Sequence, residues 1–275
     1  MSKAKTLAIE LTYDCQLRCP WCIEKKHVGT QQGPISKLDF ENLMHHIVKN
    51  HYTSYVYQGG EPLMYPEHLL EITDIIQNAI PEATFKTYTN GLAITEQLTD
   101  ELNKRHIMLT LSIDAEGYKG LSNLIHNASE PTKIITNINN LNSKNIRIVI
   151  QRNTQFADRA LLLHAIFPNT EIEIVPDYTT LTQFTVQDMN LICQEFRSLK
   201  MKSAGDDLIW FTALQGQNHK CTTETDWYIL ADNKIVTRCL LSEKIESGCV
   251  KFATQMKPQV YEMYQQIHKE MNSCL

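Results

Sequence analysis

Short runs of strand-forming residues alternate with helical stretches from Thr6 to about Pro176, and this alternation limits the possible folds more than any other feature. Six strands are predicted, at Leu7–Thr12, Ser54–Gln58, Phe85–Thr89, Met108–Ile113, Ile146–Ile150 and Ile172–Val175. Five helices are predicted between them, at Leu38–Asn50, His68–Ile80, Glu96–Lys104, Lys133–Lys144 and Phe156–Phe167. Because each crossover between parallel strands needs a helix, the pattern predicts a parallel α/β sheet. A doubly wound sheet and a partial barrel both fit it.

The alternation stops beyond Gly205. Trp227–Leu230 and Lys234–Thr237 flank Asp232-Asn233, a pair that tolerates positive φ, so we expect a β-hairpin there. A closing helix over about residues 258–272 follows. We therefore divide the chain into residues 1–204 and a smaller region, residues 205–275, which we expect to pack against the first.

Polar and glycine residues collect directly after the predicted strands. Three cysteines follow the first strand, and Gly59-Gly60-Glu61-Pro62 follows the second. The later strand ends are Thr89-Asn90-Gly91, Ser112-Ile113-Asp114, Gln151-Arg152-Asn153 and Pro176-Asp177. Since parallel α/β folds build their sites at the carboxyl ends of the strands, we expect the functional site at this edge.

Composition excludes several classes of function. A net charge of −5 leaves no basic surface of the kind that nucleic-acid binding needs. No apolar run approaches the roughly 20 residues of a membrane span, and the first residues lack the apolar segment of a secretory signal. A cytoplasmic protein is predicted. Eight cysteines in a reducing compartment indicate metal or redox chemistry rather than disulfides.

Cys15, Cys19 and Cys22 form the first candidate metal site. Thiolates are soft ligands that suit iron–sulfur clusters or zinc. Three ligands in so short a loop can hold three corners of a cubane and leave the fourth iron open. Structural zinc takes four ligands and would need His27 or a distant cysteine as well.

The cysteine spacing and the Gly-Gly-Glu-Pro segment together resemble the radical S-adenosylmethionine (SAM) superfamily, over roughly residues 6–180. The resemblance implies an open (β/α)6 partial TIM barrel with a [4Fe–4S] cluster on the three cysteines. It also implies SAM-binding roles for Trp21 beside the adenine and for Gly59, Gly60, Glu61 and Pro62 around the methionine amino group. Ser112 and Asp114 are implied at the ribose, and Gln151, Arg152 and Asn153 at the methionine carboxylate or ribose.

The chemistry implied by the resemblance is radical formation. The reduced cluster gives an electron to SAM, and the resulting 5′-deoxyadenosyl radical abstracts hydrogen from the substrate. The protein supplies orientation and excludes water. A reductant such as flavodoxin or ferredoxin is an expected partner.

A second group of cysteines lies near the carboxyl end, at Cys221, Cys239, Cys249 and Cys274. They surround the predicted hairpin and the closing helix, which resembles the twitch form of the SPASM extension that carries an auxiliary [4Fe–4S] cluster. Structural zinc and plain thiols are the alternatives for these four residues.

Radical SAM enzymes with this extension often modify ribosomally made peptides by crosslinking, thioether formation or epimerisation, and we expect a peptide substrate. The first strand begins within ten residues, so we expect a peptide to be recognised either by a separate leader-peptide-binding protein or on the barrel face itself. One alternative is a dehydrogenase or epimerase of a small molecule such as an aminosugar, and another is a glycyl-radical-enzyme activase. A non-enzymatic scaffold or sensor is disfavoured because both motifs are intact.

Overall fold

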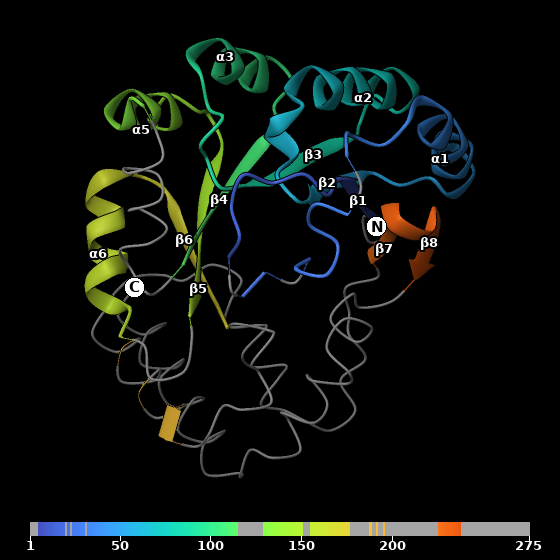
Figure 1. Ribbon diagram of the computed structural model, residues 1–275. Helices are drawn as coiled ribbons and strands as arrows, with labels where there is room; N and C mark the ends of the chain where they lie inside the picture. The colour runs from blue at the N-terminus through green and yellow to red at the C-terminus, as the bar shows by residue number, and fades with distance from the viewer. Residues whose placement is uncertain are drawn as a thin grey trace. The chain divides into compact units, whose positions relative to one another are not determined.

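The predicted alternation of strands and helices is present in the computed structural model, which describes residues 5–19, 21–22, 24–30, 32–114, 129–150, 155–176, 187–188, 191, 195 and 225–237 (Figure 1). The strands are β1 (Thr6–Thr12), β2 (Ser54–Gly59), β3 (Thr84–Thr89), β4 (Met108–Asp114), β5 (Lys144–Ile150), β6 (Glu171–Pro176), β7 (Thr225–Ile229) and β8 (Lys234–Thr237). The helices are α1 (Lys37–Asn50), α2 (Pro66–Ala79), α3 (Glu96–Lys104), α5 (Pro131–Asn139) and α6 (Ala157–Ile166), with 3-10 turns η1 (Pro62–Met64) and η3 (Leu230–Asp232).

The strand order of the sheet is β6-β5-β4-β3-β2-β1-β7-β8. The pairings of β1 with β2 and β7, of β3 with β2 and β4, and of β5 with β6 are parallel, whereas β8 pairs antiparallel with β7. Among the described strands the order ends on β6 and β8 and does not close on itself. The open partial barrel predicted from the sequence is confirmed.

The chain forms two compact units. The first comprises residues 1–111, 132–144 and 223–240, and so holds β1 to β3, most of β4, α1 to α3, nearly all of α5 and the β7–β8 hairpin. The second comprises residues 112–131, 145–222 and 241–275, in which Ile146, Ile148 and Ile150 of β5 are buried and Arg147 is paired with Glu173 of β6 at 2.6 Å.

Aromatic side chains pack between the sheet and α2 in the first unit. Phe85 of β3 stacks on Tyr55 and Tyr57 of β2, with ring centroids 5.5 and 6.2 Å apart. Thr73 of α2 donates a hydrogen bond of 3.0 Å to the Tyr57 hydroxyl. These rings occupy alternate positions along their strands, so they share the face that the helix covers, and the intervening residues belong to the opposite face.

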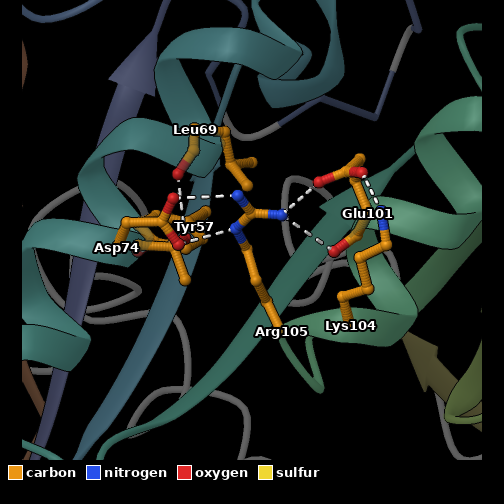
Figure 2. A network of polar contacts seen from close by, with 7 residues as sticks. Tyr57, Leu69, Asp74, Glu101, Lys104 and Arg105 are labelled. Carbon is orange, nitrogen blue, oxygen red and sulfur yellow. Dashed lines mark hydrogen bonds and ion pairs between the residues drawn. The ribbon is translucent and has the colours of Figure 1, made fainter.

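Arg105 joins α2 to α3 on the outside of this layer. Its guanidinium donates two hydrogen bonds to Asp74 of α2, at 2.7 and 2.8 Å, and a third to Glu101 of α3 (Figure 2). A planar guanidinium matches a carboxylate at two points, which fixes orientation as well as distance. The pair therefore sets how α3 lies against α2.

The hairpin lies beside β1, a position that the sequence did not predict. Thr6 to Ile9 of β1 pair in parallel with Thr225 to Tyr228 of β7.

Side chains hold the hairpin against both ends of β1. At the beginning of the strands Asp226 accepts a hydrogen bond from the Tyr52 hydroxyl and forms an ion pair of 3.2 Å with Lys5. At their other end the buried Glu10 accepts hydrogen bonds from Tyr13 and from the Leu230 amide. The hairpin is thus attached at both ends of β1.

Helix α5 ends at Asn139, five residues before the predicted boundary at Lys144. The Lys144 ammonium donates to the carbonyls of Asn139 and Leu141, both at 3.1 Å, so it satisfies one acceptor in the last helical residue and one just beyond it. Lys144 itself begins β5.

Within the described residues, no helix combines the length and apolar character needed to cross a membrane.

Candidate functional site

The loop that carries Cys15, Cys19 and Cys22 leaves the sheet after β1 and returns to it at Ile35. Thr12 forms an isolated bridge with Pro34, and the Ile35 amide donates to the Leu11 carbonyl at 2.7 Å. Inside the loop, the Gly29 amide donates to the Tyr13 carbonyl at 3.0 Å. The backbone at the two ends of the loop is therefore fixed to the sheet.

The three cysteines are half-buried. The Cys22 amide donates to the Cys19 carbonyl at 3.1 Å, so a single turn separates these two residues. Burial raises the pKa of the Cys15 thiol, against the lowering effect of the Leu17 amide, which donates to its Sγ at 3.4 Å. Within the described part of the chain, no three His, Cys, Asp or Glu side chains are arranged to hold a single metal ion.

A three-thiol loop fits an iron–sulfur cluster better than a single ion. A cubane carries its thiolates on separate irons, so the ligands stand farther apart than around one zinc ion. His27, the nearby fourth ligand that zinc would need, stacks on Tyr13 with ring centroids 5.1 Å apart. The donor set thus fits the cluster that the sequence predicts.

Gly59 and Gly60 bring the loop after β2 against the cysteine loop. The Gly60 amide donates to the Thr12 carbonyl at 2.6 Å, and the Glu61 amide donates to the Asp14 carbonyl at 2.7 Å. A Cβ at residue 59 would lie 2.3 Å from the Thr12 oxygen, and one at residue 60 would lie 2.2 Å from the Asp14 oxygen. Gly59 also has a φ of +122°. The room that the glycines leave is thus filled by the chain's own backbone.

The Glu61 carboxylate fixes a third segment, the end of β3. Its Oε1 accepts from Thr89 Oγ1 at 2.7 Å and from the Leu63 amide at 3.0 Å, and its Oε2 accepts from the Asn90 amide at 2.7 Å. Burial raises the pKa of Glu61 to about 7, although these three hydrogen bonds lower it. This side chain is saturated by the chain's own donors and holds two loops together.

The Asp14 side chain, next to Cys15, also accepts hydrogen bonds that hold these loops together. Its Oδ2 accepts from the Gly33 amide at 2.7 Å and from the Tyr65 hydroxyl, which lies between η1 and α2. Three strand ends, those of β1, β2 and β3, are consequently joined by hydrogen bonds around the cysteine loop.

The other predicted site residues fall into two groups. Trp21 lies half-buried in the cysteine loop, Pro62 is buried at the start of η1, and Ser112 is exposed near the end of β4. Asp114 is the last residue of β4, and its side chain is not among those described. Outside the described residues lie Gln151, Arg152, Asn153, Cys221, Cys239, Cys249 and Cys274.

Sequence reasoning missed Asn90 and Glu10. Asn90 was visible as a polar residue at a strand end, but nothing in the sequence showed that its amide group would reach Cys15 Sγ, at 4.0 Å. Glu10 is an acid within an otherwise apolar strand, which is itself a signal of a buried polar contact. Its partner Leu230 is 220 residues away in the sequence and could not be inferred.

Comparison with known proteins gave a match to one family model. The model described as the radical SAM superfamily matches residues 9–159, which is more than half of the chain. No curated protein sequence matched the chain.

Several solved structures share the fold. Native anSMEcpe with bound AdoMet is 16% identical with a TM-score of 0.62, over 98% of this chain and 100% of that chain. Native anSMEcpe with bound AdoMet and Cp18Cys peptide is 15% identical with a TM-score of 0.61, over 99% and 100%. Coproporphyrinogen III oxidase (HemN) from Escherichia coli, described as a radical SAM enzyme, is 11% identical with a TM-score of 0.54, over 96% and 79%.

Proposed function

The chain belongs to the radical SAM superfamily, and on that basis we propose that it uses a [4Fe–4S] cluster on Cys15, Cys19 and Cys22 with SAM to modify a peptide. The family is one of enzymes that use such a cluster and SAM. When bound, these groups supply a 5′-deoxyadenosyl radical that abstracts hydrogen from the substrate. Everything else in the reaction depends on how this chain's residues hold and orient them.

The single observation that carries the proposal is the contact between the two motif-bearing loops. Gly60 and Glu61 donate their amides to the carbonyls of Thr12 and Asp14, immediately before Cys15. The Gly-Gly-Glu-Pro segment therefore lies beside the cysteine loop, where it could bind the methionine part of SAM. In this proposal Trp21 lies against the adenine. Ser112, Asp114, Gln151, Arg152 and Asn153 bind the ribose or the methionine carboxylate.

The contacts of the Gly-Gly-Glu-Pro segment indicate which of its groups orient the loop and which bind SAM. The Glu61 side chain is occupied by Leu63, Thr89 and Asn90, so its carboxylate orients the loop. We assign the contact with SAM to the backbone around Gly60 and Glu61, and not to this carboxylate. Pro62 fixes φ at the first position of η1 and so sets the direction in which the loop leaves the site.

One observation supports a peptide as substrate. A solved structure with which this chain shares its fold, anSMEcpe with bound AdoMet and Cp18Cys peptide, contains a peptide, and the similarity spans 99% of this chain. Oxidation of a small molecule is the second candidate, favoured by the likeness to coproporphyrinogen III oxidase.

The hairpin supports an auxiliary cluster on Cys221, Cys239, Cys249 and Cys274. Asp226 and Thr237 pair directly across β7 and β8, so the start of β7 lies beside the end of β8. Cys221 precedes the first arm by four residues, and Cys239 follows the second by two. In the proposal, residues 205–275 form the twitch-like region and residues 1–204 the partial barrel, with flavodoxin or ferredoxin as reductant.

Anaerobic SAM cleavage tests the function directly. Reconstituted protein with dithionite should convert SAM to 5′-deoxyadenosine and methionine. The Cys15/Cys19/Cys22→Ala variant should lose this product, because the cluster would lose its thiolate ligands. If that variant cleaves SAM at the wild-type rate, the site assignment is wrong. A circular dichroism spectrum equal to that of wild type would show that the variant is folded.

A further inference from the structure

The side chain of Asn90 contacts the cysteine loop from the end of β3. Its Nδ2 lies 4.0 Å from the Sγ of Cys15, a reach that the large sulfur atom allows, and its Oδ1 lies 3.5 Å from Nε2 of Gln16. The Leu17 amide is the second donor to the same sulfur, at 3.4 Å. Cys15 thus accepts hydrogen bonds from its own loop and from a neighbouring strand end.

The orientation of the Asn90 amide group is fixed by a local turn. Its Oδ1 accepts a hydrogen bond of 3.0 Å from the backbone amide of Leu92. If the oxygen and nitrogen of the Asn90 side chain were exchanged, its NH₂ group would face the Leu92 N–H, and two donors would meet. The hydrogen bond from Leu92 therefore determines which atom is Oδ1 and which is Nδ2. The Nδ2 group is therefore the part of the side chain that is available to sulfur.

The backbone of Asn90 is held as firmly as its side chain. The Asn90 amide donates to Glu61 Oε2 at 2.7 Å, and the preceding Thr89 donates its hydroxyl to Glu61 Oε1 at 2.7 Å. Gly91 adopts a positive φ of 83° and donates its amide to Thr89 Oγ1 at 3.0 Å. A buried carboxylate and a glycine turn thus keep the donor at its place beside Cys15.

We propose that Asn90 is a positioning residue that makes the SAM-binding cluster easier to reduce by donating a hydrogen bond to the Cys15 thiolate. This inference rests on the proposed function, because it assumes a cluster at Cys15. Reduction adds negative charge, part of which resides on the thiolate sulfurs, and a donor to sulfur stabilises that charge. Hydrogen bonds to the sulfurs are among the factors that set the potentials of iron–sulfur clusters.

The test is an EPR-monitored redox titration of the full-length reconstituted protein, read on the signal that changes when SAM is added. Asn90→Asp retains an oxygen for the Leu92 amide but has no donor for sulfur. Asn90→Ala removes the donor without adding charge. Both variants should keep the iron content of wild type and have a more negative midpoint potential. A tenfold weaker reduction equilibrium corresponds to about 59 mV for a one-electron couple.

Asn103→Asp is the matched control. Asn103 Oδ1 also accepts a hydrogen bond from a backbone amide, that of Asn142 at 2.8 Å, and its Nδ2 donates to the Asn140 carbonyl, but this half-buried residue has no described contact with a cysteine. This variant should titrate like wild type.

Three results would overturn the inference. One is an unchanged potential in Asn90→Ala, since a shift in Asn90→Asp alone would be explained by the added charge. Another is an equal shift in Asn103→Asp. The third is loss of iron from both Asn90 variants, which would make the residue necessary for assembly instead. Wild-type protein that takes up no iron would contradict the proposed function itself, which is a separate outcome.

Discussion

The backbone of Gly60 lies so close to Asp14 that a Cβ at residue 60 would stand 2.2 Å from the Asp14 carbonyl oxygen. The atom in the way belongs to backbone and cannot rotate aside. Gly60→Ala should therefore push the Tyr13–Asp14 segment away and displace Cys15 with it. We expect a loss of about 3 kcal/mol in the free energy of unfolding and a fall in bound iron. Denaturant unfolding and iron analysis after reconstitution measure the two effects.

Gly33→Ala provides the comparison for that substitution. Gly33 lies in the same loop with a φ of +89°, but a Cβ there would meet no atom within 4 Å. The change should cost about 1 kcal/mol from backbone conformation alone, with iron content unchanged. Equal iron loss in the two variants would show that the close approach at Gly60 is not what holds the cysteine loop.

Glu10 is expected to hold the hairpin in place. Glu10→Ala would leave the Tyr13 hydroxyl and the Leu230 amide without this acceptor, at a cost of about 3 kcal/mol. The Leu230 amide should also exchange its hydrogen much faster, which hydrogen–deuterium exchange measures. Glu41→Ala, a change at an exposed position of α1, should have little effect on either quantity. Unchanged protection at Leu230 in Glu10→Ala would contradict this role.

His46 should make stability depend on pH. Burial lowers its pKa below the ordinary 6.5, as do Lys5 and Lys49, while Asp226 raises it. Because the unfolded chain then binds a proton more readily than the folded one, the free energy of unfolding should fall as the pH drops through and below 6.5. The stabilising contribution is complete above that value.

His46→Gln tests the pH dependence without removing the side-chain contact. Glutamine can still bond the Tyr52 hydroxyl, which lies 3.0 Å from His46 Nε2, but it does not titrate. Between about pH 7.5 and about pH 5, wild type should lose more stability than this variant. His45→Gln, at the exposed neighbouring position, should follow the wild-type curve. Parallel curves for wild type and His46→Gln would refute the prediction.

Iron counting separates the interpretations of Cys221, Cys239, Cys249 and Cys274. With an auxiliary cluster, wild type should bind about eight irons and the Cys15/Cys19/Cys22→Ala variant about four. A zinc site would instead leave that variant colourless with about one zinc. Plain thiols would leave it without either metal and reactive toward a thiol reagent. Unchanged iron in Cys274→Ala would mean three protein ligands and an open iron.

Much of the fold was predictable because it depends on local patterns. The alternation of strand-forming runs with helical stretches identified β1 to β6. Asn233 adopts the positive φ, 45°, that the hairpin needs. The boundary of α5 was wrong because Lys144 binds carbonyls near the helix end, a contact that periodicity does not encode.

The site was predictable only as far as residue type indicates chemistry. The cysteine spacing and the Gly-Gly-Glu-Pro segment could be read directly, and the structure brings their loops together. The role of Glu61 as a link between strand ends could not be read, because it depends on Thr89 and Asn90, which are distant in sequence. The same is true of the contact between Asn90 and Cys15.

The pairing of β7 with β1 has a consequence for the order of events in folding. Glu10 and its partner Leu230 are 220 residues apart, which a ribosome covers in roughly 10 to 45 s. Throughout that interval β1 has an open edge on the side that β7 later fills, with Leu7 and Ile9 in the same strand. An open apolar edge is where strands of different chains join and aggregate. Nascent chains stalled before residue 225 should therefore depend on chaperones more than completed ones do.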